Sequence, residues 1–277
     1  RSCFMKSSLG KNISRYRKLK NITQEELATQ LNITFQAVSK WETNQTYPDI
    51  TLLPHLASIL EVSIDRLMGY TSHQEQKRTI YEDEYAQDGY YWGLAPSKMC
   101  YKILSMLPPT KPLKLLDIGC GEGKDAVFFA RNGYQVTAFD IADAGIEKTK
   151  RLADKIGVHV NVFKADVLDF RLESNYDILY SNGVLHYMKP ELRQEIFFNY
   201  QQHTSPHGIH VLSAFVTKPF IPPAPEHEPN GHNWLSGELF SLYSNWLIKE
   251  CDEVIFDCNS SGIAHKHAMN IIVAEKP

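Results

Sequence analysis

The chain has 277 residues, of which 43% are hydrophobic and 22% are charged, and its formal net charge is −3. This composition is ordinary for a soluble globular chain, and the length fits two domains or one large one. No apolar run is long enough to span a membrane and no signal peptide is visible, so we expect no membrane partner and a cytoplasmic location.

Charge is distributed unevenly along the chain. Residues 1–70 carry a net charge of +3, and the remainder carries −6. A small basic segment ahead of an acidic one favours a polyanionic partner for the first segment alone, although a solvated helix face would give the same excess. The five cysteines include no C-x-x-C pair, which argues against a disulfide framework or a zinc ribbon.

Residues 5–70 have the pattern of a small all-α domain. Thr23 and Glu26 form a capping-box pair, and apolar residues follow at helical spacing. Asn32, a residue that tolerates a left-handed backbone, then marks a tight turn. Thr34 can cap the next helix. The segment therefore predicts two helices joined by a short turn, followed by further short helices.

The stretches TQEELATQLNITFQAVSKWE and LASILEVSIDRLMGY resemble the Cro/phage-repressor (Xre-type) helix-turn-helix family, over about Leu9 to Tyr70. The resemblance implies double-stranded DNA binding by a homodimer, with a recognition helix from Thr34 to about Glu42 in the major groove. The alternative is a helical domain used only for protein contacts. The implied DNA-contacting residues are Gln24, Thr34, Phe35, Gln36 and Lys40.

Residues 71–89 are predicted to be a linker, because Thr71–Thr79 is polar and has no apolar period. Aromatic residues are dense from Tyr81 onward and continue through Tyr90–Trp92. We expect this segment to be either a hydrophobic clasp on the following domain or a lid over a pocket. The proline-rich loop Phe220–Trp234 is the second predicted part of such a lid.

Strands and helices alternate through the predicted second domain, residues 90–277. The expected strands cover 113–118, 135–139, 160–164, 176–180 and 209–215, and the expected helices include 125–132 and 144–156. Residues 253–258 and 269–274 are predicted to form a late hairpin. This α/β alternation is typical of a doubly wound, Rossmann-like sheet with ligands at the carboxyl ends of the strands.

The loop after the first strand of this domain is glycine-rich but departs from the dinucleotide pattern. It has glycines at 119, 121 and 123, and Lys124 stands where G-x-G-x-x-G requires its third glycine. Glu122 lies inside the turn, where a carboxylate would face a pyrophosphate unfavourably. Asp140 ends the second strand and can bind two ribose hydroxyls, for NAD as well as for other nucleosides. Asp166 ends the third strand and can accept a hydrogen bond from an adenine amino group.

Together these features resemble the class I S-adenosyl-L-methionine (SAM) methyltransferases, from about Tyr90 to Pro277. The resemblance implies that SAM is the cofactor and that Asp117 and the glycine loop hold its methionine end. The implied cofactor-binding residues are Asp117, Gly119, Gly121, Gly123, Asp140, Ile141, Asp166, Val167 and Ser181.

The stretches YYWGLAPS and GELFSLYSNWLIKECDEVIFD resemble tellurite-resistance-type and related small-molecule methyltransferases. The resemblance implies a small methyl acceptor such as a metalloid oxyanion, a thiol or a phenol. No catalytic residue can be assigned. The candidate acceptor pocket comprises Tyr91, Trp92, His186, Tyr187, His232 and Trp234. His265 and His267 share one strand face, but with no third ligand visible we predict no metal site.

DNA is not the predicted methyl acceptor. The loop Ser181–Val184 lacks the Pro-Pro-aromatic motif of amino-methylating DNA enzymes, and no Pro-Cys nucleophile is present. Two hypotheses remain for the whole chain. It is either an active small-molecule methyltransferase carrying a DNA-binding domain, or a transcriptional regulator whose methyltransferase-like domain senses SAM or another ligand without turnover.

Overall fold

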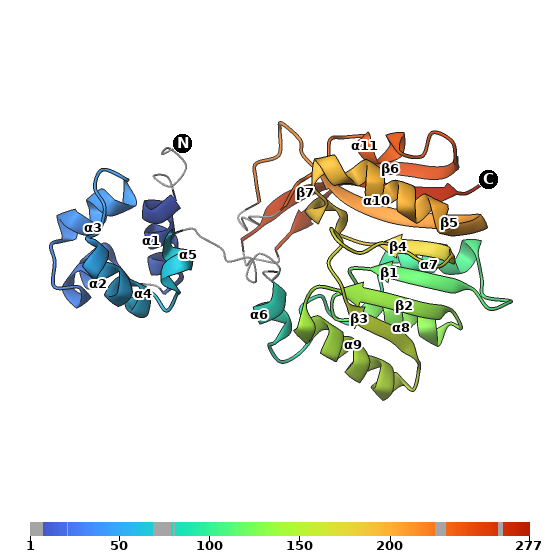
Figure 1. Ribbon diagram of the computed structural model, residues 1–277, viewed down its shortest axis with the longest axis horizontal. Coiled ribbons are helices and arrows are strands. Elements are labelled where there is room, and N and C mark those ends of the chain that lie inside the picture. The colour runs from blue at the N-terminus through green and yellow to red at the C-terminus, as the bar shows by residue number, and fades with distance from the viewer. Residues whose placement is uncertain (1–7, 21, 69–78, 80, 225–230, 260–262) are drawn as a thin grey trace. The chain divides into compact units, whose positions relative to one another are not determined.

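The computed structural model describes residues 8–20, 22–68, 79, 81–224, 231–259 and 263–277 (Figure 1). The chain divides into two compact units, Arg1–Lys77 and Arg78–Pro277. Within the described residues, no helix is both long enough and apolar enough to cross a membrane.

The first unit is built from short helices, as the sequence predicts. They are α1 (Ser8–Leu19), α2 (Gln24–Gln30), α3 (Phe35–Glu42), the 3-10 turn η2 (Ile50–Leu52), α4 (Leu53–Ile59) and α5 (Ile64–Met68). The capping box at Thr23 and Glu26 is formed at the start of α2. Asn32 has the expected left-handed backbone, with φ of 53°. Leu27, Val38 and their neighbours form one apolar core.

A buried ion pair joins three helices of the first unit. Arg17 of α1 donates to the carboxylate of Glu42, at the end of α3, over 2.6 and 3.0 Å. Gln24, the first residue of α2, donates to the same carboxylate over 2.8 Å. Because all three groups converge on one point, the turn between α2 and α3 is fixed relative to α1.

The second unit is a seven-stranded sheet in the order β3-β2-β1-β4-β5-β7-β6 (Figure 1). The strands are β1 (Lys114–Ile118), β2 (Gln135–Asp140), β3 (Val160–Lys164), β4 (Tyr176–Ser181), β5 (Thr204–Val216), β6 (Leu247–Cys258) and β7 (His265–Glu275). The first five are parallel, and β7 runs antiparallel to both of its neighbours. The predicted doubly wound architecture and late hairpin are confirmed, although the hairpin strands are longer than the sequence suggests.

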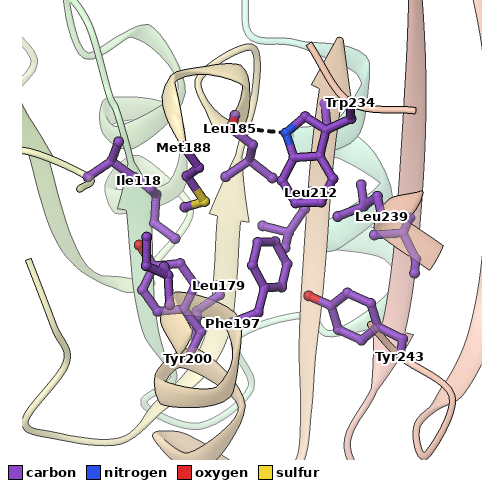
Figure 2. Packing of buried hydrophobic residues seen from close by; sticks show 14 of the residues in the cluster. Ile118, Leu179, Leu185, Met188, Phe197, Tyr200, Leu212, Trp234, Leu239 and Tyr243 are labelled. Carbon is purple, nitrogen blue, oxygen red and sulfur yellow. Dashed lines mark hydrogen bonds between the residues drawn. The ribbon is translucent and has the colours of Figure 1, made fainter. Parts of the chain in front are cut away.

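Helices cover both faces of this sheet. They are α6 (Tyr81–Tyr85), α7 (Lys98–Met106), α8 (Lys124–Arg131), α9 (Asp143–Ile156), the 3-10 turn η3 (Leu185–Tyr187), α10 (Pro190–Gln202) and α11 (Glu238–Ser241). Successive residues of β1 point to opposite sides: Leu115 packs in the core with α7, α8 and α9, whereas Leu116 packs in the core with α10. Figure 2 shows Phe197 and Tyr200 of α10 against the second of these cores.

The structure differs from the predicted linker over residues 71–89. Residues 69–78 and 80 lie outside the described residues, but α6 belongs to the second unit. Glu82 of α6 accepts hydrogen bonds from the backbone N–H groups of Asp143 and Ala144 at 2.9 and 3.0 Å, and so caps the start of α9. Tyr85 is buried. The polar, acidic composition of α6 does not reveal that Glu82 anchors this helix by capping α9.

Trp234 lies in the core instead of lining a pocket, so its prediction as an acceptor residue is wrong. Its side chain is fully buried, and its indole N–H donates to the Leu185 carbonyl over 2.9 Å (Figure 2). The Arg193 guanidinium stacks 4.1 Å above its ring and binds the Glu238 carboxylate at 2.8 and 3.0 Å. These contacts fix the chain beside β5, where Trp234 forms a parallel bridge with Val216.

We predict that Trp234→Ala lowers the free energy of unfolding of the second unit by about 3–5 kcal/mol, because it empties a core site. Trp92→Ala is the matched control. Its side chain is 44% exposed, so the loss stays below about 2 kcal/mol. Urea titrations of the full chain, followed by far-UV circular dichroism, measure both values. Equal destabilisation by the two substitutions would contradict the core placement of Trp234.

Candidate functional site

The glycine-rich loop joins β1 to α8 at the carboxyl edge of the sheet. Gly119, Gly121 and Gly123 all have left-handed φ values, of 73°, 54° and 82°. A Cβ on Gly119 would lie 2.3 Å from Val184, and one on Gly123 would lie 2.5 Å from Thr149. These positions therefore require glycine for two reasons, the backbone conformation and the close approach of neighbouring elements.

Asp140 holds the loop from the end of β2. Its two carboxylate oxygens accept from the backbone N–H groups of Gly121 at 2.8 Å and Ala142 at 2.9 Å. Burial raises the pKa of Asp140 above its usual range, and the hydrogen bonds from Ala142, Gly121 and Ile141 oppose that rise. The sequence predicted Asp140 and Ile141 as cofactor contacts. The structure places them beside the loop, with Asp140 also tying the loop to β2.

Asp117, in the adjacent strand β1, is the least satisfied acid of the site. Its side chain is 2% exposed, and no described residue donates a hydrogen bond to its Oδ2. Burial, followed by the charges of Asp125 and Asp140, raises its pKa well above the usual range. A buried carboxylate with an unfilled oxygen is costly unless a cation or a strong donor reaches it.

The aromatic segment closes over the glycine loop. The Tyr85 hydroxyl lies 3.0 Å from where a Cβ on Gly121 would stand, and it accepts from the Trp92 indole over 3.0 Å. Tyr91 and Trp92 pack edge to face at 4.8 Å. The aromatic segment therefore packs on the second unit in the way expected of a hydrophobic clasp. Residues 225–230 of the second predicted lid segment lie outside the described residues.

Glu122 does not face the ligand side of the loop as the sequence suggested. Its carboxylate binds Lys148 of α9 at 2.8 Å and accepts from the Trp92 backbone N–H at 3.2 Å. The charge of Glu122 is therefore neutralised within the protein, and it does not by itself disfavour a pyrophosphate. Lys148 and the capping residue Glu82 were missed from the sequence, because each acts on a loop far away along the chain.

The remaining predicted cofactor residues lie at the carboxyl ends of β3 and β4, two strands that β2 and β1 separate in the sheet. Asp166 follows β3, and its Oδ1 accepts from the Leu168 backbone N–H at 2.9 Å, which shapes a turn. Val167 is buried in the core. Ser181 ends β4, and its hydroxyl donates to the Ile118 carbonyl over 3.1 Å. Asp166 thus stays at the predicted edge, whereas the Ser181 hydroxyl makes a contact between strands.

Four of the predicted acceptor residues divide into two groups. The rings of His186 and Tyr187 lie 4.2 Å apart, and the Phe215 ring lies 5.0 Å from His186. The His232 backbone N–H donates to the His186 carbonyl over 2.6 Å. His186, Tyr187 and His232 are therefore together beside the ends of β4 and β5, while Tyr91 belongs to the aromatic segment over the glycine loop.

In the first unit, the predicted recognition helix is α3, capped by Thr34, whose hydroxyl accepts from the Ala37 N–H at 3.3 Å. Phe35, Gln36 and Lys40 are exposed along it. Gln24 instead donates to Glu42 within the domain. The Phe35 side chain is 42% exposed on this helix.

The expectation that His265 and His267 have no third ligand is wrong. Cys258, which lies beside them in the neighbouring strand, offers a sulfur, and the three ligand atoms lie within 4.8 Å of one another. Residues 259–264 separate Cys258 from this pair along the chain, and the register between β6 and β7 brings the three together.

Comparison with known families accounts for both units. The model of the tellurite resistance protein TehB family matches residues 80–264, which is more than half of the chain. The chain belongs to the TehB family. The helix-turn-helix family model matches residues 13–67, in agreement with the fold of the first unit.

Individual relatives support the same assignment. The probable S-adenosyl-L-methionine-dependent methyltransferase TehB of Haemophilus influenzae is 27% identical over 142 residues, which are 51% of this chain and 49% of that protein. The chain thus spans about half the length of the curated relatives it matches. The crystal structure of TehB from Haemophilus influenzae superposes with a TM-score of 0.59 at 21% identity, covering 73% of this chain and 67% of that one.

A second solved structure has the same fold. It is the Burkholderia thailandensis 1,6-didemethyltoxoflavin-N1-methyltransferase with bound 1,6-didemethyltoxoflavin and S-adenosylhomocysteine. Its TM-score is 0.50 at 20% identity, and the alignment covers 64% of this chain and 76% of that one. The second unit of this TehB-family chain therefore has the class I methyltransferase fold.

We predict that Asp117→Asn raises the free energy of unfolding of the ligand-free protein at neutral pH. The folded-state pKa of Asp117 is raised, so its ionisation costs stability as pH rises from the unfolded pKa toward the folded one. The gain from Asp117→Asn should therefore grow with pH over that window. Urea titrations at several pH values test this, with the exposed Asp154→Asn as control. A variant less stable than wild type at neutral pH would contradict the account.

Proposed function

We propose that the second unit binds SAM and transfers its methyl group to a small molecule. The buried carboxyl group of Asp117 carries the proposal, because it lies two residues before the glycine loop and its Oδ2, which has no donor among the described residues, can accept from a cation or a strong donor. The ammonium group at the methionine end of SAM is such a cation. NAD offers no ammonium group, so the same oxygen favours SAM over a dinucleotide.

The residues present fit the rest of this cofactor. The left-handed glycines let the backbone approach a ligand closely, and they would hold the methionine end together with Asp117. Asp140 ends β2, and Asp166 follows the adjacent parallel strand β3. We assign the ribose hydroxyls to Asp140, with Ile141 beside it, and the adenine amino group to Asp166, with the Val167 backbone N–H reaching the ring. Ser181 is the weakest member of the set, since its hydroxyl already has a backbone partner.

Methyl transfer from a sulfonium is an in-line displacement, which depends on positioning and on the exclusion of water more than on acid–base groups. SAM supplies the methyl group when bound. The residues of this chain orient both reactants, with Tyr91, Trp92, His186, Tyr187 and His232 as the acceptor side. The named relatives support a small acceptor, and we keep metalloid oxyanions, thiols and phenols as its class.

We further propose that the first unit binds double-stranded DNA as a homodimer. Gln36 and Lys40 are exposed on α3, where amide and ammonium groups can pair with adenine and guanine. Phe35 is suited to a thymine methyl group. Gln24 is a weaker phosphate contact than the sequence implied, because it already binds Glu42.

The fusion to a helix-turn-helix unit favours a second candidate, a regulator that senses SAM without turnover. Isotope-labelled SAM and a panel of selenite, tellurite, thiols and small phenols separate the two. A labelled product supports the enzyme. Binding of SAM without any product across the panel supports the sensor.

We predict that Asp140→Asn weakens SAM binding by about 10- to 100-fold, as expected for the loss of charge-assisted hydrogen bonds. The asparagine retains an oxygen for the Gly121 N–H, so the loop is preserved better than with alanine. Isothermal calorimetry of the full chain measures the affinity, with Asp154→Asn as the control. Unchanged SAM affinity in Asp140→Asn, or tight binding of NADH by the wild type, would remove the assignment.

We predict that the full chain selects an inverted repeat from random duplexes, with half-sites about one helical turn apart. Gln36→Ala should relax the preference at one base pair of each half-site, at a cost of about 1–3 kcal/mol. Gln30→Ala, an exposed change on α2, is the control. A chain that shows no preference over random DNA in gel-shift titrations would contradict DNA recognition.

A further inference from the structure

We propose that Cys258, His265 and His267 form a binding site for a borderline transition-metal cation of the Zn²⁺ class. Cys258 is the last residue of β6 and lies directly opposite His265, the first residue of β7. Directly paired residues of antiparallel strands share one face of the sheet, and so do residues two apart in one strand. The hairpin therefore places one thiol and two imidazoles on the same face.

The ligand atoms are already close to coordination distance. The Cys258 sulfur and one ring nitrogen from each histidine lie within 4.8 Å of one another, and the two Nε2 atoms are 2.9 Å apart. A tetrahedral zinc ion, with Zn–N near 2.0–2.1 Å and Zn–S near 2.3 Å, holds such atoms about 3.3–3.7 Å apart. Small side-chain rotations, which move the ligand atoms by a few tenths of an ångström to about 1 Å, would bring them from their present positions to the tetrahedral arrangement.

A backbone carbonyl prepares His265 for this role. His265 Nδ1 lies 2.7 Å from the Ile263 carbonyl oxygen. A carbonyl only accepts, so Nδ1 carries the proton, and the Nε2 of the neutral ring presents its lone pair toward His267 and Cys258. Donation of the second ring nitrogen to a carbonyl is the usual way in which proteins orient a metal-binding histidine.

Neighbouring aromatic rings hold the site in place, and the adjacent Lys266 is directed away from it. The His267 ring packs 4.9 Å from Phe215 and 5.7 Å from Phe256, which restricts its rotation. Lys266 points to the opposite face and pairs with Asp257 at 2.6 Å. The three candidate ligands are half-buried, so water can supply the fourth ligand of a tetrahedral ion.

The donor set decides the class of ion. A thiolate and two imidazoles suit zinc and other borderline or soft metals, whereas magnesium and calcium prefer oxygen ligands. The site is separate from the glycine loop, but Phe215 lies between His267 and the acceptor-side His186, with ring distances of 4.9 and 5.0 Å. A metal bound here would therefore stiffen the sheet edge next to the proposed acceptor residues.

The test is a titration of the metal-free, fully reduced full chain with Co²⁺, a spectroscopic probe for zinc sites, followed by displacement with Zn²⁺. We expect one equivalent to bind, with a thiolate-to-cobalt charge-transfer band in the near ultraviolet and strong visible bands of tetrahedral cobalt. Cys258→Ser should abolish the charge-transfer band. His267→Ala should weaken Zn²⁺ binding by more than about 100-fold, because even an orienting partner of a ligand costs about 10- to 100-fold.

Cys251→Ser is the matched control, since Cys251 is an exposed cysteine of the same strand. It should leave the band and the affinity unchanged, and unchanged thermal unfolding should show that all variants are folded. Absence of a charge-transfer band in the wild type, or its persistence in Cys258→Ser, would overturn the proposal. Neither readout involves SAM, so this result is independent of the proposed methyltransferase activity.

Discussion

Two buried carboxyl groups at the ends of neighbouring strands constrain the second unit. Asp117 and Asp140 are 2% and 9% exposed, and burial raises the pKa of both carboxyl groups, so ionising either of them is costly. Asp140 meets that cost with backbone N–H groups from the glycine loop, which fixes the loop. Asp117 retains an oxygen with no donor among the described residues. The two acids therefore differ in role: Asp140 anchors the glycine loop, whereas we propose that Asp117 accepts from the ligand.

The sequence predicted those parts of the structure that depend on local chemistry. Short stretches of sequence predict the capping box at Thr23, the left-handed Asn32, the glycine loop and the alternation of strands and helices. Their physical causes are local hydrogen bonds and backbone sterics, so a reader of the sequence can find them. The same holds for Asp140 at the end of β2.

The sequence failed where a contact joins distant segments. Trp234 stands in a proline-rich stretch that suggests a loop, yet Arg193 and Glu238 hold it in the core. Glu122 was expected to face a ligand, because its ion-pair partner Lys148 lies far along the chain, in α9, and the sequence does not connect the two. Cys258 was not connected with His265 and His267, since only the hairpin register aligns them. Each of these errors concerns a side chain whose partner is set by tertiary packing and not by spacing.

The central claim is that a cation of the cofactor occupies the unfilled oxygen of Asp117. The most direct measurement is the calorimetric binding of SAM between mildly acidic and neutral pH, in buffers with different ionisation enthalpies. Because the pKa of Asp117 is raised in the free protein, binding of a cation should release a proton, and SAM affinity should rise with pH. Asp117→Asn should lose both effects. Tight SAM binding by the wild type with no proton release and no pH dependence would contradict the account.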